Sequence, residues 1–525
     1  MKKFWAFWLS VGICTQALSY DQPPVVPYES RAAWQPVNRI DELMSACWKA
    51  EGVKPARVCS DSVFVRRAYL DVIGTLPTVA EVKAFLDDTS PKKRQKLIDR
   101  LLQRKEFADY WALKWCDLLR VKSEFPINLW PNAVQCYHRW VRDAVRENMP
   151  YDRFVRTLLT SSGSNFRNPP VNFYRAVQNR TPEGLASAVA LTFMGVRTHK
   201  WPEQRLKGMA AFFSQVRYKK THEWKEEIVY FDPFQRDRSE SRWGVFPDGT
   251  KVLLQPGTDP RVVFADWLIR PDNRWFTQNI VNRLWFWVFG QGIIDPPDDI
   301  RPDNPPVQPQ VLQYLQHELV ASHYDLKHLL RLIFTSRTYQ LSFIPQDDDK
   351  KKAARLFAYY PMRRLEAEVL IDAICQVTGT HESYSSRTPE PYTFIPESNR
   401  TIQLADGSIS STFLELFGRP PRDTGLVSER KNRMTPSQRL HLLNSSHIQN
   451  KIVNGPNMRS ILRRRMRNPR QIIQHLYLLM LSRYPTNDEI KDILQYSKET
   501  RTYGKTLLSD VAWALLNSPE FLYRH

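Results

Sequence analysis

The sequence is poor in cysteine, and no two of its cysteines are close together. Six cysteines occur in 525 residues, and five of them lie beyond the first twenty positions. These five are Cys47, Cys59, Cys116, Cys136 and Cys375. Their closest spacing is twelve positions, which excludes the Cys-x-x-Cys pairs of haem attachment, zinc ribbons and thioredoxin-like redox centres. In an oxidising compartment the spacing favours a local Cys47–Cys59 disulfide, and a Cys116–Cys136 disulfide if the two helices that carry these residues pack antiparallel. Because the count is odd, at least one thiol stays free or pairs between chains.

The sequence also lacks a long apolar run, a phosphate loop and a catalytic serine elbow. Beyond the N-terminus no segment reaches the roughly 20 apolar residues of a membrane helix, so we expect no integral membrane span. Glu499 stands where a phosphate loop ending at Gly504-Lys505-Thr506 would need its first glycine. No Gly-x-Ser-x-Gly occurs, and the 11 histidines show no His-Glu-x-x-His spacing. Nucleotide-driven and serine-nucleophile chemistry therefore have no support.

Acidic residues are outnumbered by basic ones. The 55 Asp and Glu residues face 75 Lys and Arg residues, which gives a formal net charge of +20. For an exported chain this balance favours anionic polysaccharide over nucleic acid, and we expect no nucleic-acid partner. The alternative is that the charge only keeps the protein in solution.

The first nineteen residues have the three parts of a secretory signal peptide. Lys2 and Lys3 supply the positive region, residues 4–13 are apolar, and Ala17-Leu18-Ser19 fits a small-x-small cleavage site. The apolar stretch is too short for a membrane anchor. We therefore expect export to the periplasm or the extracellular space, with cleavage near Ser19.

Apolar periodicity indicates a mainly α-helical protein in which a small β insertion separates two helical regions. The expected strands are 227–231 and 251–254, joined through a turn at 246–250 that contains Asp-Gly. The expected boundaries are 1–19 for the signal peptide, 20–36 for an extended lead-in, 37–220 for the first helical region, 221–257 for the insertion and 258–525 for the second helical region.

Long stretches of the sequence resemble a known family. Residues 66–78 read Arg-Arg-Ala-Tyr-Leu-Asp-Val-Ile-Gly-Thr-Leu-Pro-Thr, and further signatures follow at 264–268, 279–292, 417–423 and 513–521. In this order they resemble the secreted planctomycete-type family that pairs domain of unknown function 1549 with domain of unknown function 1553. The resemblance implies a two-part architecture and export, and it implies no defined activity.

The sequence departs from that family where the resemblance places a haem site. The family typically has Cys-x-x-Cys-His followed by His-Pro, whereas residues 193–202 keep only His199 and Pro202. Many relatives also carry a cytochrome c-like domain, which is absent here, and a Cys-Glu-Cys-Glu-Arg run, which here reads Leu426-Val427-Ser428-Glu429-Arg430. We therefore expect no haem and no other cofactor, and we expect His199 to pack at a helix end.

The best group of polar candidates lies in the second helical region. Its members are Asn282, Arg283, Asp295, Asp298, Asp299 and Asp303. The four carboxylates stand on a proline-rich loop and could bind Ca²⁺ through oxygen ligands. Two of them, Asp298 and Asp299, could instead act as a general acid/base pair on a glycan. In a third interpretation the acids are structural, cap helices and pair with Arg283 and Arg301.

Two clusters of arginines with neighbouring acids are candidates for anion binding. The first cluster is Arg419, Arg422, Asp423, Glu429 and Arg430, and the second is Arg66, Arg67 and Asp71. Guanidinium groups suit sulfate and carboxylate ligands, but such clusters also form buried ion-pair networks. Both interpretations stay open at the level of the sequence.

Charge and export together favour a binding or accessory role on anionic, sulfated polysaccharide. An enzyme is the competing class, a glycan hydrolase or lyase that uses the loop with Asp298 and Asp299. A haem-linked electron carrier is the third class, and the missing cysteines oppose it. The sequence does not indicate an oligomeric state.

Cleavage of the signal peptide gives a first testable outcome. Sequencing of the exported protein should start at or near Tyr20, because signal peptidase selects small residues at the positions of Ala17 and Ser19. Replacing both residues with bulky ones should leave an uncleaved precursor. Recovery of the protein from the cytoplasm with Met1 in place would contradict the prediction.

Overall fold

The computed structural model describes most of the chain outside its first residues. The described residues are 23–233, 242–388, 393, 395–463 and 468–525. The predicted signal peptide at 1–19 lies outside them. The described chain is mainly α-helical, with a small β region near 216–254, as the periodicity predicts. Within the same residues, no helix has the length and apolar character needed to cross a membrane.

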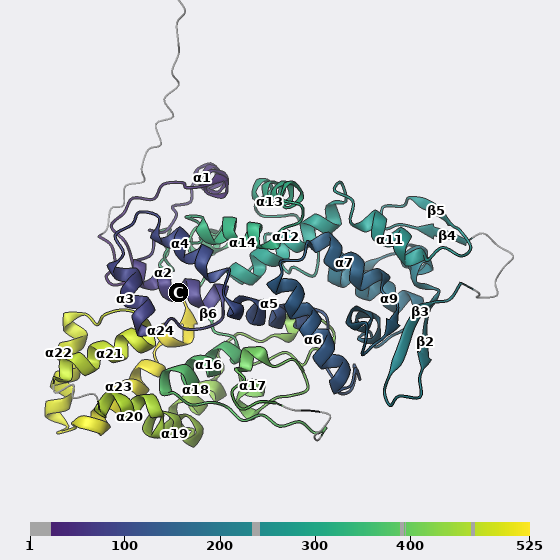
Figure 1. Cartoon of the computed structure of the whole chain (residues 1–525). Helices are drawn as coiled ribbons and strands as arrows, with labels where there is room; N and C mark the ends of the chain where they lie inside the picture. The colour runs from purple at the N-terminus through teal and green to yellow at the C-terminus, as the bar shows by residue number, and fades with distance from the viewer. Residues whose placement is uncertain (1–22, 234–241, 389–392, 394, 464–467) are drawn as a thin grey trace, which may run out of the picture.

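The first helical region is a succession of short helices in which α5 and α6 pack side by side (Figure 1). Its helices are α1 (Arg39–Glu51), α2 (Asp61–Val72), α3 (Val79–Asp87), α4 (Lys93–Leu101), α5 (Lys105–Leu118), α6 (Pro131–Arg146), α7 (Tyr151–Thr160), α8 (Asn172–Arg175), α9 (Pro182–Val189) and α10 (Glu203–Ala210). Local signals define their ends. Thr78 and Glu81, for example, form a reciprocal capping box at the start of α3.

The second helical region lies on two sides of the first. Its helices are α11 (Pro260–Leu268), α12 (Arg274–Phe289), α13 (Pro309–Ala321), α14 (Leu326–Thr335), α15 (Lys350–Arg355), α16 (Ala367–Thr378), α17 (Thr412–Leu416), α18 (Pro436–Asn444), α19 (Ser446–Asn454), α20 (Pro456–Arg463), α21 (Pro469–Leu481), α22 (Asn487–Glu499), α23 (Gly504–Leu516) and α24 (Pro519–Leu522). In the view of Figure 1, α12 to α14 run above α5, and α16 to α24 lie below it.

Short strands form three small antiparallel sheets. They are β1 (Gly163–Ser164), β2 (Val216–Lys220), β3 (Glu227–Phe231), β4 (Arg242–Val245), β5 (Lys251–Leu254), β6 (Arg363–Arg364) and β7 (Tyr523–Arg524). Both strands predicted for the insertion are present, as β3 and β5, but they belong to different sheets. β3 lies between β1 and β2, and the turn at 246–250 joins β5 to β4. The sequence pattern missed β2 because most of its residues are polar and partly exposed.

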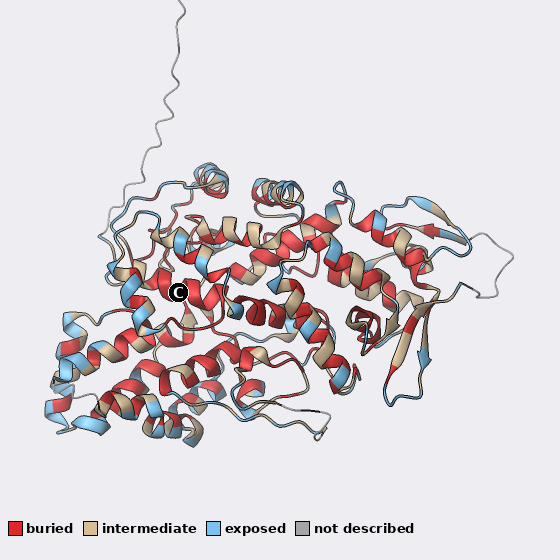
Figure 2. Cartoon of the chain, viewed as in Figure 1, coloured by how far each residue is buried: buried red, intermediate tan, exposed pale blue. Residues whose placement is uncertain are grey.

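Buried apolar residues of both helical regions form one continuous core. Figure 2 shows them concentrated on the central helices, with exposed residues on outer helices such as α1 and α22. Trp287 of α12 contributes to the join, because its ring makes edge contacts with Trp111 at 5.9 Å and Trp115 at 5.4 Å on α5. Trp285, two residues earlier in the same helix, is fully buried.

The cysteines differ from the prediction. All five in the described chain are free, so the expected Cys47–Cys59 and Cys116–Cys136 disulfides are not formed. Cys116 is buried in α5, whereas the thiol of Cys136 on α6 donates to the carbonyl oxygen of Asn165 at 3.3 Å. Packing of two helices as neighbours therefore does not bring these two side chains together.

The α2 arginines are structural, which settles one of the alternatives left by the sequence. Arg66 and Arg67 are each 1% exposed. The guanidinium of Arg66 donates to the carbonyl oxygens of Met480 at 2.6 Å and Phe521 at 3.0 Å. That of Arg67 donates to the carbonyl oxygen of His525 at 2.8 Å. The two arginines therefore bind the backbone of the C-terminal segment, residues 480–525, and are too buried to contact a ligand.

Asp71, also on α2, ties the same segment to the middle of the chain. Its carboxylate accepts hydrogen bonds from the hydroxyls of Tyr339 at 2.9 Å and Tyr360 at 2.7 Å. It also forms an ion pair with Arg524 of β7 at 2.8 Å, and both side chains are at most 2% exposed. Neutralising this buried carboxylate is costly, because the loss of its negative charge leaves the buried guanidinium of Arg524 without compensation.

Replacing Asp71 should therefore destabilise the fold strongly. We expect Asp71→Asn to lower the free energy of unfolding by about 3–5 kcal/mol, measured by urea denaturation with tryptophan fluorescence. The control is Asp266→Asn, which breaks an ion pair with Arg156 whose side chains are 57% and 41% exposed. That variant should lose at most about 1 kcal/mol. Equal losses in the two variants would contradict the prediction.

Candidate functional site

A large cavity lies where the two helical regions meet, and we call it the central cavity. Its volume is about 1080 Å³, and it is lined by α5, the end of α12, strand β6 and the segment 415–439. Eight of its lining side chains are basic and three are acidic. These residues are Lys114, Asp117, Arg283, Arg363, Arg364, Glu366, Glu415, Arg430, Lys431, Arg433 and Arg439. The lining is therefore strongly cationic.

The rim of the central cavity carries cations without counter-ions. Lys431, Arg433 and Arg439 are exposed, and within the described part of the chain they form no ion pair. They belong to the segment that follows the predicted arginine cluster and to the first turns of α18. Cations that are exposed and unpaired at the entrance of a cavity attract anionic groups from solution.

The inner end of the cavity is formed by Lys114 of α5 and Glu366. Their charged groups are 3.3 Å apart, and their side chains are 10% and 7% exposed. Burial lowers the pKa of the Lys114 amine to about 8, although the neighbouring Glu366 opposes this change. Burial alone would raise the pKa of Glu366, but Arg524 and Lys114 hold it well below its usual range. Glu366 therefore stays ionised at neutral pH.

Arg364 fixes the shape of the cavity wall. Its guanidinium donates to the carbonyl oxygens of Phe417 at 2.6 Å and Lys431 at 2.8 Å. The side chain is 1% exposed, and this burial lowers its pKa to about 10. Since one buried arginine holds two separate points of the segment 415–439, the rim residues that follow Lys431 have a defined position.

The predicted arginine cluster is a buried ion-pair network beside the cavity. Arg430 pairs with Asp117 of α5 and Glu368 of α16, at 2.7 Å in each case. Arg422 pairs with the same Asp117 at 2.8 Å, and Arg419 approaches Glu368 at 3.4 Å. The guanidinium groups are thus satisfied by protein carboxylates. Of the three arginines, only Arg430 lines the cavity.

Asp423 and Glu429 complete this network at its outer end. Asp423 pairs with Lys122 at 2.6 Å. The carboxylate of Glu429 accepts a hydrogen bond from the backbone N–H of Thr424 at 2.6 Å. Both acids therefore stabilise the loop between the arginines, and the interpretation as a structural network is the one that the geometry supports.

The predicted group around Asn282 is divided by the structure. Asn282 is fully buried, and its amide exchanges two hydrogen bonds of 2.8 Å with the backbone of Ile294, which leaves it no contact with a ligand. Arg283 lines the central cavity and pairs with Asp298 at 3.1 Å. The other oxygen of Asp298 accepts the backbone N–H of Val427 at 2.8 Å. Asp298 has 0% exposure and is inaccessible to a substrate.

The remaining loop acids lie on the other side of Asp298. Asp299 pairs with Arg301 at 3.2 Å and with Lys200 at 3.5 Å, in a separate groove of about 570 Å³. Asp303 pairs with Arg301 at 2.9 Å. Asp295 accepts the backbone N–H of Gly292 at 3.2 Å, and burial raises its pKa. Asp299 and Asp303 thus share Arg301, whereas Asp295 and Asp298 have other partners.

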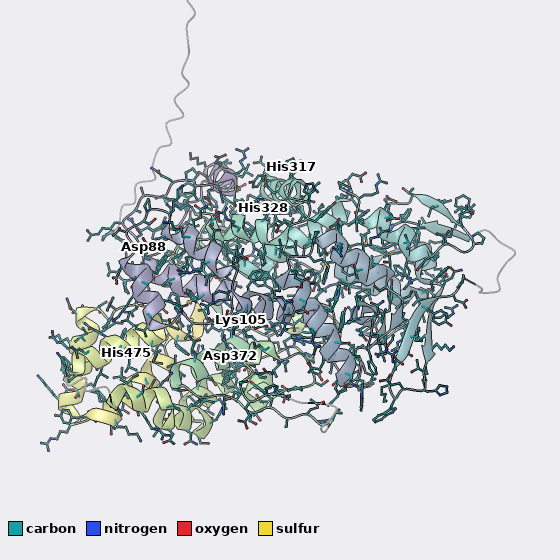
Figure 3. All side chains as sticks on the ribbon, in the orientation of Figure 1. Asp88, Lys105, His317, His328, Asp372 and His475 are labelled. Atoms are coloured by element: carbon teal, nitrogen blue, oxygen red, sulfur yellow. The ribbon has the colours of Figure 1, made fainter. Side chains whose placement is uncertain are left out.

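This distribution gives the calcium prediction no geometric support. In the described ranges, no three His, Cys, Asp or Glu side chains are grouped so that they could hold a metal ion. Figure 3 shows His475 on α21 well away from His317 on α13 and His328 on α14. His199, expected to pack at a helix end, is exposed in a short turn before α10.

Sequence reasoning missed the residues at the inner end of the cavity. Lys114 is a lone lysine between tryptophans of an apolar helix, and no spacing rule distinguishes it from a surface lysine. The pair Arg363-Arg364 and the run from Arg430 to Arg433 were available as signals, since both place basic residues next to apolar helices.

Two family comparisons agree with the architecture. The family described as protein of unknown function (DUF1549) matches residues 39–217, and the one described as protein of unknown function (DUF1553) matches residues 260–497. The chain belongs to the proteins that pair these two domains. The central cavity lies between them, because α5 belongs to the DUF1549 part and α12, β6 and α18 to the DUF1553 part. No curated protein and no solved structure matches the chain.

The buried network predicts a specific dependence of stability on pH. Burial alone would raise the pKa of Glu368, but Arg430 and Arg419 lower it to about 2. A carboxyl group with a lowered pKa stabilises the fold above its unfolded pKa, near 4.5, and this contribution disappears as the pH falls towards 2. Glu368→Gln should therefore lose about 3 kcal/mol at pH 7, since each pKa unit corresponds to about 1.4 kcal/mol.

The measurement is urea denaturation of the wild type and of Glu368→Gln at pH 7 and at acidic pH. The difference between the two proteins should shrink as the pH falls. The control is Glu203→Gln, because the side chains of Glu203 and its partner Lys207 are 78% and 64% exposed, and this variant should match the wild type. A difference that does not vary with pH would contradict the assignment.

Proposed function

We propose that the protein is exported and binds anionic, sulfated polysaccharide in the central cavity. The observation that carries the proposal is the lining of eight basic and three acidic side chains. Sulfate esters and carboxylates are the anions that guanidinium groups bind with paired hydrogen bonds. A signal peptide at residues 1–19 would bring the protein to the compartment in which such polymers occur.

The acids in the cavity strengthen this preference for anions. Asp117 is paired with Arg422 and Arg430, and Glu366 with Lys114 and Arg524. Their negative charges are therefore used inside the protein and do not repel a ligand at the rim. Among the described residues, the unpaired charges on the exposed part of the lining are those of Lys431, Arg433 and Arg439, which are positive, and that of Glu415, which is negative, so a net positive charge remains.

The size and apolar lining of the cavity suit a chain of sugar units. A volume of about 1080 Å³ is at the upper end of the range for ligand sites, roughly 300–1,000 Å³. Phe286 and Trp287 of α12 also line it and offer apolar surface to the faces of sugar rings. The combination of aromatic and guanidinium groups favours a sulfated glycan over a small inorganic anion.

Binding should depend on salt and on the rim cations. We expect retention on immobilised dextran sulfate and none on neutral dextran, and retention should weaken as salt shortens the Debye length from about 10 Å at 0.1 M. The double variant Arg433→Glu, Arg439→Glu should bind dextran sulfate at least about tenfold more weakly, because two attractions become repulsions. The affinity is measured by titration at fixed ionic strength.

The matched control changes the same amount of charge elsewhere. Lys219 and Lys220 are exposed on β2, at one end of the molecule (Figure 1). Lys219→Glu, Lys220→Glu should keep the affinity close to that of the wild type. Equal losses in the two double variants would mean that only net charge matters. Equal retention of the wild type on dextran and dextran sulfate would contradict the proposal.

A further inference from the structure

We infer that the central cavity cleaves uronate-containing polysaccharide by β-elimination, with the amine of Lys114 as the base. The inference rests on the proposed binding function and names a reaction for the same cavity. Lys114 lies at the inner end, with its nitrogen 3.3 Å from Glu366 and 4.4 Å from the centre of the Tyr110 ring. An amine in this position is not required for attraction of anions at the rim.

The carboxylates of the cavity do not suit hydrolysis. A glycoside hydrolase of the usual kind needs one carboxyl group that is protonated and can donate to the leaving oxygen. Asp117 is held by two arginines, and Glu366 is held by Arg524 and Lys114. The pairing of Glu366 holds its pKa well below its usual range, so this carboxylate accepts and does not donate hydrogen bonds. Glu415, the third acid of the lining, is exposed to solvent.

β-Elimination needs different groups, and the cavity has them. The hydrogen next to a uronate carboxylate becomes acidic when cations neutralise that carboxylate and stabilise the charge that develops on it. Arg363 and Arg430 line the cavity, are 16% and 15% exposed, and are close enough to disfavour a charge on Lys114. Because Arg430 already pairs with Asp117 and Glu368, and Arg363 with Asp71, these two arginines favour the neutral amine. The unpaired rim cations Lys431, Arg433 and Arg439 are the groups that would neutralise a bound carboxylate.

The protonation state of Lys114 fits a base at slightly alkaline pH. Burial lowers the pKa of its amine to about 8, so an appreciable fraction is neutral near that pH. Lysines become bases or nucleophiles when they are desolvated next to other cations. The lysines at the rim, such as Lys431, are exposed and lack this environment.

The reaction is balanced without a cofactor. The neutral nitrogen of Lys114 removes the hydrogen at C5 of the uronate as a proton. The electron pair of that C–H bond forms a double bond between C4 and C5, and the bond from C4 to the glycosidic oxygen breaks. The leaving oxygen takes a proton from water, and the resulting hydroxide is neutralised by the Lys114 ammonium. The products are an unsaturated uronate end and a chain with a new hydroxyl group.

The test compares two sulfated polymers, chondroitin sulfate, which contains uronate, and carrageenan, which does not. We expect the wild type to bind both and to release product only from chondroitin sulfate, measured as the ultraviolet absorbance of the conjugated double bond. Lys114→Met should lower the rate by about 100- to 10,000-fold, a far larger change than its effect on the affinity for either polymer. Lys105→Met, at the exposed start of the same helix, is the control and should keep the full rate.

The outcomes separate the inference from the function on which it rests. Binding of both polymers with no product from chondroitin sulfate, heparin or alginate would overturn the inference and leave the proposed function intact. Product formation that survives in Lys114→Met would overturn the role of Lys114. Failure to bind either polymer would contradict the proposed function itself. If Lys114→Met does not fold, the wild type decides, because its rate should rise with pH through about 8 and a flat profile would contradict the inference.

Discussion

The architecture of the protein depends on the buried ion pairs of the Glu366 carboxylate. It stands just before α16 and is shared by Lys114 of α5 and Arg524 of β7. It therefore joins the DUF1549 part, the DUF1553 part and the C-terminal strand at one point. Arg524 also pairs with Asp71 of α2 at 2.8 Å, so the network continues into the first helical region. Breaking any of these pairs would leave a buried charge without compensation.

This network also explains why the central cavity is cationic. Acids that lie near the interface, such as Asp117 and Glu368, each have arginine partners within 3.5 Å. The protein holds its two parts together with these acids, and the rim cations Lys431, Arg433 and Arg439 form no ion pair within the described residues. The charge of the cavity is thus a consequence of how the interface is stabilised, and a ligand with several negative groups is the natural complement.

The fold follows from sequence patterns to a larger extent than the site does. Periodicity and capping signals predict helices well because they are local: the Thr78–Glu81 box and the end of α12 at Gly290 are both present. The strands 227–231 and 251–254 are also local and correct. Their pairing is not, because β2 and β4 carry weak apolar patterns and strand pairing depends on contacts between distant residues.

Contacts between distant residues also decide which polar side chains form the site, and local sequence patterns do not predict them. Asn282 and Arg283 are neighbours in the sequence. The side-chain amide of Asn282 makes both of its hydrogen bonds with the backbone of Ile294, whereas the side chain of Arg283 lines the central cavity. No pattern in a single sequence separates a buried, satisfied polar group from one that faces a ligand. Lys114 is the opposite case, since its surroundings come from Glu366 and Arg524, several hundred residues later in the chain.

The segment in which the resemblance places a haem motif has a different use in this protein. The carbonyl oxygen of Gly195 accepts the backbone N–H of Ile300 at 2.9 Å, so the segment supports the loop that contains Asp298. Gly195 has a φ of 66°, and a Cβ atom there would meet the side chain of Asn279 at 2.7 Å. Because Asp298 in turn holds Arg283 at the cavity wall, this segment contributes to the position of a cation in the central cavity. The segment without cysteines therefore contributes to the wall of the central cavity through packing.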